Sequence, residues 1–157
     1  MINDEALRAV VSKYDARNKD YNAIVYVCLE AGAGDTMAAS ATAFALSGLA
    51  GAAVGGALGG LANDWSIMTV SDDGLWFYIL DKFKMSPVVT RQLSVPYNAI
   101  TKMRIRKFLI WTSIKIHFAN GHKRHKLKVL ASSKCVGIKR QKENLNILLD
   151  CLRSNIP

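Results

Sequence analysis

The uncharged stretch from Met37 to Ala62 is the feature that most constrains how this chain can fold. It runs for 26 residues and contains ten alanines, six glycines and only seven larger apolar residues. A single helix of this length would be about 39 Å long, which is enough to cross a bilayer. Composition alone therefore allows a membrane segment. The position of the stretch between predicted strands distinguishes a single membrane span from an insertion that returns to the same side.

The glycines of this stretch recur at intervals of four residues. On a helix, this spacing produces a flat face of small side chains, which lets a second helix approach closely, as in a glycine zipper. We therefore predict that oligomer or membrane contacts are made through six glycines. These are Gly48, Gly51, Gly55, Gly56, Gly59 and Gly60.

The position of the stretch favours an out-and-back course. If the predicted strands on either side pair as neighbours, their joined ends lie together, whereas a single membrane span would separate them. Each glycine also costs a helix about 0.8–1 kcal/mol relative to alanine, so the helices need tight packing. We expect a Gly/Ala-rich helical insertion over 36–64, turning near Ser47 and Gly48. Its packing partner remains open: its own domain, a sister subunit or lipid.

Helices are predicted at both ends of the chain. The first covers 3–18, with Asn3 as its N-cap and acidic residues in its first turn. The second covers 133–155. Apolar residues recur at i, i+3, i+4 and i+7 in each helix. The two stripes are Leu7, Val10, Val11 and Tyr14, and Leu145, Leu148, Leu149 and Leu152.

The remaining segments favour short antiparallel strands. We expect a strand over 22–29, a hairpin over 65–82 and a strand over 88–93. The hairpin turns at 71–74, where Gly74 would supply a positive φ. Pro96 limits the next strand to an edge or a late start. Residues 97–118 are strand-like, and the Asn120-Gly121 pair predicts a hairpin to a return strand over 122–130.

Positive charge is concentrated in one part of the chain. Residues 82–142 contain sixteen Lys and Arg but no Asp or Glu, within a chain of net charge +9. Such a field attracts anionic lipid, an acidic protein surface or nucleic acid, although a merely solvated basic face is the alternative. Alternation along strands groups these cations by face. The predicted anion- or lipid-binding residues are Lys102, Arg104, Arg106, Lys107, Lys115, Lys123, Arg124, Lys126 and Lys128.

Aromatic and histidine side chains are interleaved with these cations. Phe108 and Trp111 are interpreted as core residues, with stacking on nucleic-acid bases as the alternative. His117, His122 and His125 flank the Asn-Gly turn, where we expect them to add pH-dependent charge. Because no Cys or carboxylate lies nearby to complete a ligand set, no metal site is predicted.

Chemical motifs point away from catalysis. The sequence has no nucleophile motif and no phosphate-binding loop, so we expect neither an enzyme nor a cofactor. The three cysteines are scattered, which favours reduced thiols. The acidic, polar N-terminus does not resemble a signal peptide. A cytoplasmic protein is expected, peripheral to or partly inserted at the inner face of the membrane.

The region from Trp65 to Arg153 resembles the bacterial pleckstrin-homology-like (PH-like) domains. The resemblance is carried by the hairpin SIMTVSDDGLWFYIL, the VPYNAI segment, the Asn-Gly hairpin and the terminal helix. It implies an α+β fold: a bent antiparallel sheet or partial barrel of about seven strands, capped by the C-terminal helix.

The same resemblance implies a function in binding. PH-like domains bind lipid headgroups or peptides, or self-assemble, and are not enzymes. We therefore expect one domain over 1–157 that binds an anionic membrane surface or acidic partner through its basic strands. It would self-associate or anchor through the Gly/Ala-rich segment. A membrane-embedded homo-oligomer and a nucleic-acid-binding protein are the alternatives. The acidic first hairpin, with Asp72, Asp73 and Asp81, argues against a phosphoinositide site between the first strands.

Overall fold

The computed structural model describes residues 2–15, 23–31, 62–81, 87–120 and 123–156. It contains one seven-stranded antiparallel sheet in the order β4-β3-β2-β1-β7-β6-β5, together with two described α-helices. The predicted α+β class and strand number are confirmed. The helices are α1 (Asp4–Tyr14) and α4 (Gln141–Asn155). The strands are β1 (Ile24–Ala31), β2 (Ala62–Val70), β3 (Gly74–Leu80), β4 (Val89–Pro96), β5 (Ile100–Phe108), β6 (Trp111–Asn120) and β7 (Lys123–Ser132).

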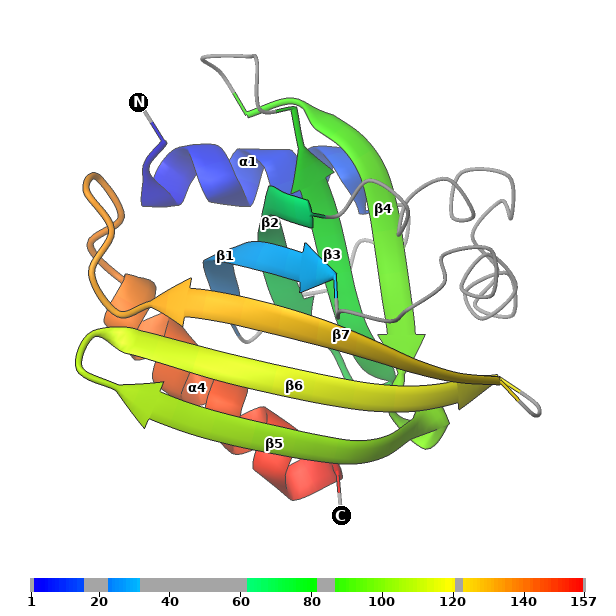
Figure 1. The fold of residues 1–157 in the computed structure, drawn as a ribbon. Coiled ribbons are helices and arrows are strands. Elements are labelled where there is room, and N and C mark those ends of the chain that lie inside the picture. The colour runs from blue at the N-terminus through cyan, green and yellow to red at the C-terminus, as the bar shows by residue number, and fades with distance from the viewer. Residues whose placement is uncertain (1, 16–22, 32–61, 82–86, 121–122, 157) are drawn as a thin grey trace.

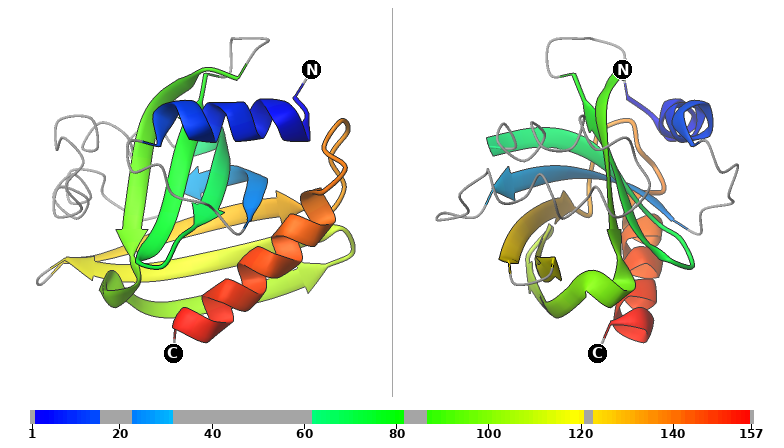
Figure 2. Two further views of the ribbon diagram at one scale, coloured as in Figure 1. Left: turned by 180° about the vertical axis from the view of Figure 1, so that it is seen from behind. Right: turned by 90° about the vertical axis from the view of Figure 1, so that its right-hand side faces the viewer.

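The sheet bends around β1, the strand through which its two halves are hydrogen-bonded to each other. One edge of β1 pairs with β2 along most of the strand, while the other pairs with β7 only from Val27 to Ala31. Figures 1 and 2 show β5, β6 and β7 running across the direction of β2, β3 and β4, with α4 behind the first group. A short 3-10 turn, η3 (Tyr97–Ala99), connects β4 to β5.

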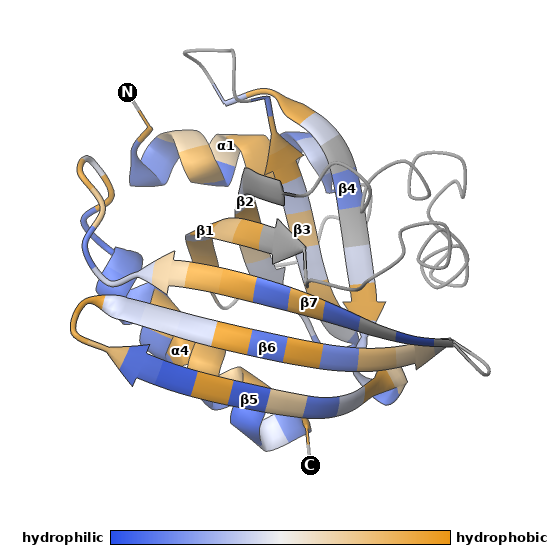
Figure 3. Cartoon of the chain, viewed as in Figure 1, coloured by the Kyte–Doolittle hydropathy of each residue, from blue (hydrophilic) through white to orange (hydrophobic). Residues whose placement is uncertain are grey.

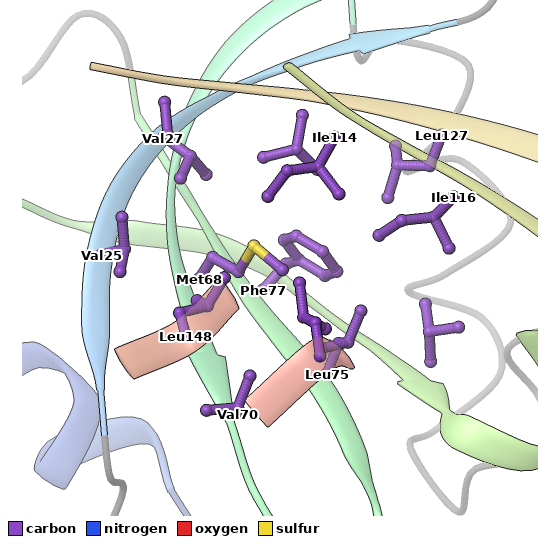
Figure 4. Close-up of a cluster of buried hydrophobic side chains, with 14 of the residues drawn as sticks. Val25, Val27, Met68, Val70, Leu75, Phe77, Ile114, Ile116, Leu127 and Leu148 are labelled. Atoms are coloured by element: carbon purple, nitrogen blue, oxygen red, sulfur yellow. The ribbon is translucent and has the colours of Figure 1, made fainter. Parts of the chain in front are cut away.

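The main core lies inside this bend. Inward residues of both halves meet there, and Met68, Phe77 and Ile114 are fully buried (Figure 4). The predicted α4 stripe covers the core, with Leu148 and Leu152 completely buried. Burial of each such side chain stabilises the fold by about 1.5–3 kcal/mol. The C-terminal helix is therefore an integral part of the core.

A second core lies on the opposite face of β2 and β3. There α1 packs Leu7, Val10 and Val11 against Trp76 and Tyr78. Because both faces of β3 are covered, all seven of its residues are buried. Asn3 caps α1 as predicted, since its side-chain oxygen accepts a hydrogen bond from the Ala6 amide at 2.8 Å.

Polar side chains at the start of α4 bind the backbone where β1 and β7 diverge. The Gln141 amide nitrogen donates to the carbonyls of Tyr26 and Ser132, at 2.7 and 3.1 Å, and its oxygen accepts from the Tyr26 amide at 3.0 Å. Asn144 donates to the Ile24 carbonyl at 3.0 Å. These two side chains replace the strand that β1 lacks along this part of its edge.

Several sequence predictions need correction. The C-terminal helix begins at Gln141 rather than Ser133, because Gly137 has a φ of 87°, which a helix cannot accommodate. The prediction that Gly74 has a positive φ is wrong, because Gly137 is the described glycine with a positive φ. A glycine is needed at position 74 because the backbone of β4 passes close to it: a Cβ there would lie 2.4 Å from the Val95 carbonyl oxygen. The strand-like sequence over 97–118 does not form one strand. It contains η3 and then two strands, β5 and β6, which are joined by a turn at Leu109 and Ile110.

The topological premise about the Gly/Ala-rich segment is confirmed. β1 and β2 are antiparallel neighbours, and Glu30 lies opposite Ala62. Residues 36–61 of the predicted insertion, including its six glycines, lie outside the described residues, whereas 62–64 belong to β2, so the predicted boundary at 64 is wrong. Neither described helix is long and apolar enough to cross a membrane.

Replacing Gln141 with Ala should destabilise the fold by about 3 kcal/mol, because three backbone groups, one buried and two partly buried, would lose their partner. The measurement is urea unfolding followed by circular dichroism. Asn146→Ala, at an exposed position of the same helix, is the control and should cost less than about 0.5 kcal/mol. Equal midpoints for the two variants would contradict this role for Gln141.

Candidate anion-binding face and apolar tip

The basic residues of β5, β6 and β7 align in rows across the three strands. Arg104 lies opposite Lys115, which lies opposite Lys128. In the neighbouring row, Lys102, His117 and Lys126 are partners in the same way. Arg124 lies opposite Ala119 beyond one end, and Arg106 opposite Ser113 beyond the other. We call this surface the basic face. Its cations are Lys102, Arg104, Arg106, Lys115, Arg124, Lys126 and Lys128.

The basic face points away from the core. The residues that alternate with its cations, such as Ile114, Ile116, Leu127 and Val129, are fully buried beneath it. The three cations on β5 and Arg124 are exposed, while Lys115, Lys126 and Lys128 are half-buried. The predicted grouping of Lys102, Arg104 and Arg106 on one face is confirmed.

Like charges face one another across these strands. Directly opposed cations in neighbouring strands destabilise a sheet, so a face of this kind is stabilised by anions from outside. No Asp or Glu occurs in β5, β6 or β7, and the adjacent strand places Glu30 opposite Lys128 at the margin. The face therefore presents a broad positive surface to solvent.

Two of the nine predicted cations differ from the rest. Lys107 is exposed but pairs with the buried Thr112, which places it at an alternate position of β5. Lys123 lies opposite Asn120, beside the turn that lies outside the described residues. The register places His117 opposite Lys126 and His125 opposite Phe118. His122 is outside the described residues.

An apolar surface lies at one end of the basic face. Phe108, Leu109 and Val136 are 73%, 89% and 91% exposed, and Ile110 and Trp111 are each 38% exposed. We call these five residues the apolar tip. Figure 3 shows the β5–β6 turn in hydrophobic colours, next to strands whose hydropathy alternates. The interpretation of Phe108 and Trp111 as core residues is therefore wrong.

The apolar tip joins two segments that are distant in the sequence. The Ser133 amide donates to the Ile110 carbonyl at 2.7 Å, which holds the segment between β7 and α4 against the β5–β6 turn. Beside them lies a cavity of about 380 Å³, lined by residues that include Ile110, Trp111 and Val136. Its wall also contains Tyr26 and Trp65, whose rings stack with centroids 5.0 Å apart. This cavity could not be predicted from the sequence, because its walls come from five separate segments.

Burial affects the titratable groups of this cavity. It raises the pKa of the Tyr26 hydroxyl to about 12, with smaller contributions from Cys135 and Cys28, and it raises the pKa of the Cys135 thiol. The three cysteines, all within the described residues, form no disulfide, and Cys28 is buried. The Tyr26 hydroxyl and the Cys135 thiol therefore remain neutral at physiological pH, which suits an apolar site.

A second cavity, of about 310 Å³, lies between the first hairpin and η3. It is lined by Asp73, Asn98, Ser94 and neighbouring backbone, and its described lining contains no Lys or Arg. It therefore lacks the charge needed to hold an anion. The aligned cations lie instead on the second half of the sheet.

Comparison with known proteins gives no family assignment. No protein-family model and no curated protein matches the chain. Among solved structures, the hSac2 domain from human phosphoinositide phosphatase Sac2 is similar, with a TM-score of 0.49 and 7% identity. The match covers 96% of this chain and 79% of that one. At this level of similarity it carries no argument about function.

The raised pKa of Tyr26 predicts how stability depends on pH. Unfolded tyrosine ionises near pH 10, whereas Tyr26 in the fold ionises near pH 12. Its contribution is therefore complete below pH 10 and falls as the pH rises toward 12. Urea unfolding between pH 9 and 11.5 should show a smaller decline for Tyr26→Phe than for the natural chain. Parallel declines would contradict this assignment.

Proposed function

We propose that this protein is a non-enzymatic, PH-like domain that docks on anionic membrane surfaces through its basic face. The observation that carries the proposal is the alignment of cations in rows across β5, β6 and β7, without a carboxylate in these strands. The bent antiparallel sheet with a C-terminal helix in its core is the architecture that the PH-like resemblance implies. A cytoplasmic location at the inner face of the membrane fits this proposal.

The layout of the charges favours an extended surface over a compact ligand. Neighbouring strands lie about 4.8 Å apart, and rows two residues apart are about 6.7 Å apart, so the cations form a lattice. Neither of the two described cavities opens among them. A membrane presents anionic headgroups over such an area, and each nearby cation contributes about 1 kcal/mol of binding.

Charge reversal on the edge strand tests the proposal. The triple variant Lys102→Glu, Arg104→Glu and Arg106→Glu should weaken binding to phosphatidylcholine vesicles containing 30% phosphatidylserine by at least about 100-fold. Binding is measured by co-sedimentation at low and physiological salt. All three side chains are exposed, so the fold should tolerate the changes.

A matched variant separates the location of charge from net charge. Arg8→Glu, Lys13→Glu and Lys142→Glu change the same number of exposed cations on α1 and α4. This variant should retain most of its binding. Equal losses in the two variants, equal binding of the natural chain to neutral vesicles, or no binding to either vesicle would contradict the proposal.

Nucleic-acid binding is the second candidate, and the exposure of Phe108 and Trp111 favours it. Aromatic side chains beside a basic groove stack on the bases of single strands. A gel shift with a single-stranded oligonucleotide, weakening steeply with salt and lost in Phe108→Ala, would support this candidate. Stronger binding to the oligonucleotide than to anionic vesicles would favour it over the membrane.

We further propose that the segment 37–62 drives self-association or membrane anchoring through its spaced glycines. Because Glu30 and Ala62 are paired, a four-residue Gly/Asn turn in place of 32–61 should leave the domain folded. Size-exclusion chromatography with light scattering should then show a smaller assembly than the full chain, or a chain that no longer needs detergent. Identical masses and solubility would contradict this contact.

A further inference from the structure

We propose that the apolar tip inserts into the interfacial layer of the anionic bilayer on which the basic face docks. The inference rests on the proposed membrane binding and adds an anchoring site to it. The tip comprises Phe108, Leu109, Ile110, Trp111 and Val136. These residues are uncharged, so the charge pattern of the sheet does not explain why they are exposed.

The turn itself carries a residue that folding does not favour. Leu109 has a φ of 51°, in the left-handed region. Among the described residues other than glycine, it is the one with a positive φ. Two-residue hairpin loops favour Gly or Asn at such positions, because a branched side chain is strained there. Leu109 is also 89% exposed, so its side chain contributes no packing within the domain. A contact outside the domain accounts for a leucine at this position.

The tip is a preformed surface with parts from two segments. Phe108 and Trp111 are cross-strand partners, so the loop between them has only two residues. Val136 lines the same cavity as Ile110 and Trp111, and its segment is joined to the turn by the hydrogen bond from the Ser133 amide to the Ile110 carbonyl. Little conformational freedom is therefore lost when the tip enters a new environment.

Charge around the tip identifies the occupant. Along β5, alternate exposed positions read Lys102, Arg104, Arg106 and then Phe108, so the cations of the basic face lead directly to the tip. Lys107 and Lys134, which are also exposed, are close to tip residues in the sequence. Apolar side chains with neighbouring cations and a tryptophan suit the headgroup boundary of an anionic bilayer, where indole rings concentrate. A neutral apolar partner would not use the cations.

β1 leads away from the tip. Trp111 and Ser132 are partners at the tip, whereas Ala31, where β1 ends, lies opposite Leu127 in the middle of β7. Figure 1 shows the β5–β6 turn at the left of the sheet and the end of β1 nearer the centre of the picture. Substitutions at the tip therefore leave the ends of β1 and β2, between which the Gly/Ala-rich segment is inserted, unchanged.

The double variant Leu109→Asn and Val136→Ser tests this inference in the full chain. Asn tolerates the left-handed turn, so stability in urea should be equal or higher. Partitioning onto vesicles with 30% phosphatidylserine should fall about 30-fold, because two apolar side chains no longer transfer from water. The binding that remains should depend more steeply on salt. Leu109→Met with Val136→Ile keeps the tip apolar and should retain binding.

Tryptophan fluorescence provides the second measurement. Lipids brominated near the headgroup should quench the natural chain, and Trp111→Phe should lose most of that quenching. Unchanged partitioning of the Asn/Ser variant, or quenching that persists without Trp111, would overturn tip insertion while leaving the basic face intact. No vesicle binding by the natural chain would overturn both proposals. A vesicle-free dimer that becomes monomeric in the Asn/Ser variant would overturn insertion in favour of a second copy of the chain.

Discussion

The junction between β1 and β7 is the interaction on which the whole structure depends. β1 is the described strand that connects the two halves of the sheet, and it pairs with β7 over only five residues. Where the two strands part, the Gln141 amide binds backbone groups of both. This arrangement gives the Tyr26 amide and the Tyr26 and Ser132 carbonyls a hydrogen-bond partner where the sheet turns. It also positions α4, whose leucines complete the core formed by the bend.

The bend gives the two halves of the sheet different surroundings. In one half, β2 and β3 are covered on one face by α1 and on the other by the main core, so all seven residues of β3 are buried. Among the described residues, β5, β6 and β7 pack one face on the main core, and their other face carries the cations. The same geometry places the β5–β6 turn beside the segment that leads to α4. A charged face and an apolar tip therefore arise next to each other.

Much of this fold could be predicted from the sequence, because most elements obey local rules. The Asn3 cap, the α1 and α4 stripes and the Asn-Gly hairpin all follow such rules, and the alternating basic strands fixed the membership of the basic face. The β5–β6 turn could not be predicted, because Leu109 and Ile110 contradict turn chemistry. The exposed tip was missed for the same reason, since apolar residues in a strand-like run indicate a core. The role of Gln141 could not be predicted, because its partner in β1, Tyr26, is more than a hundred residues away along the chain.

The orientation of the domain on a membrane is the most direct test of the account. Amide NMR signals of the natural chain can be recorded on anionic nanodiscs that carry a small fraction of gadolinium-chelating lipid. The account predicts the strongest paramagnetic broadening at the tip and along β5, β6 and β7, with α1 largely unaffected. Uniform broadening, or the strongest broadening at α1 or α4, would contradict the claim that the basic face meets the membrane.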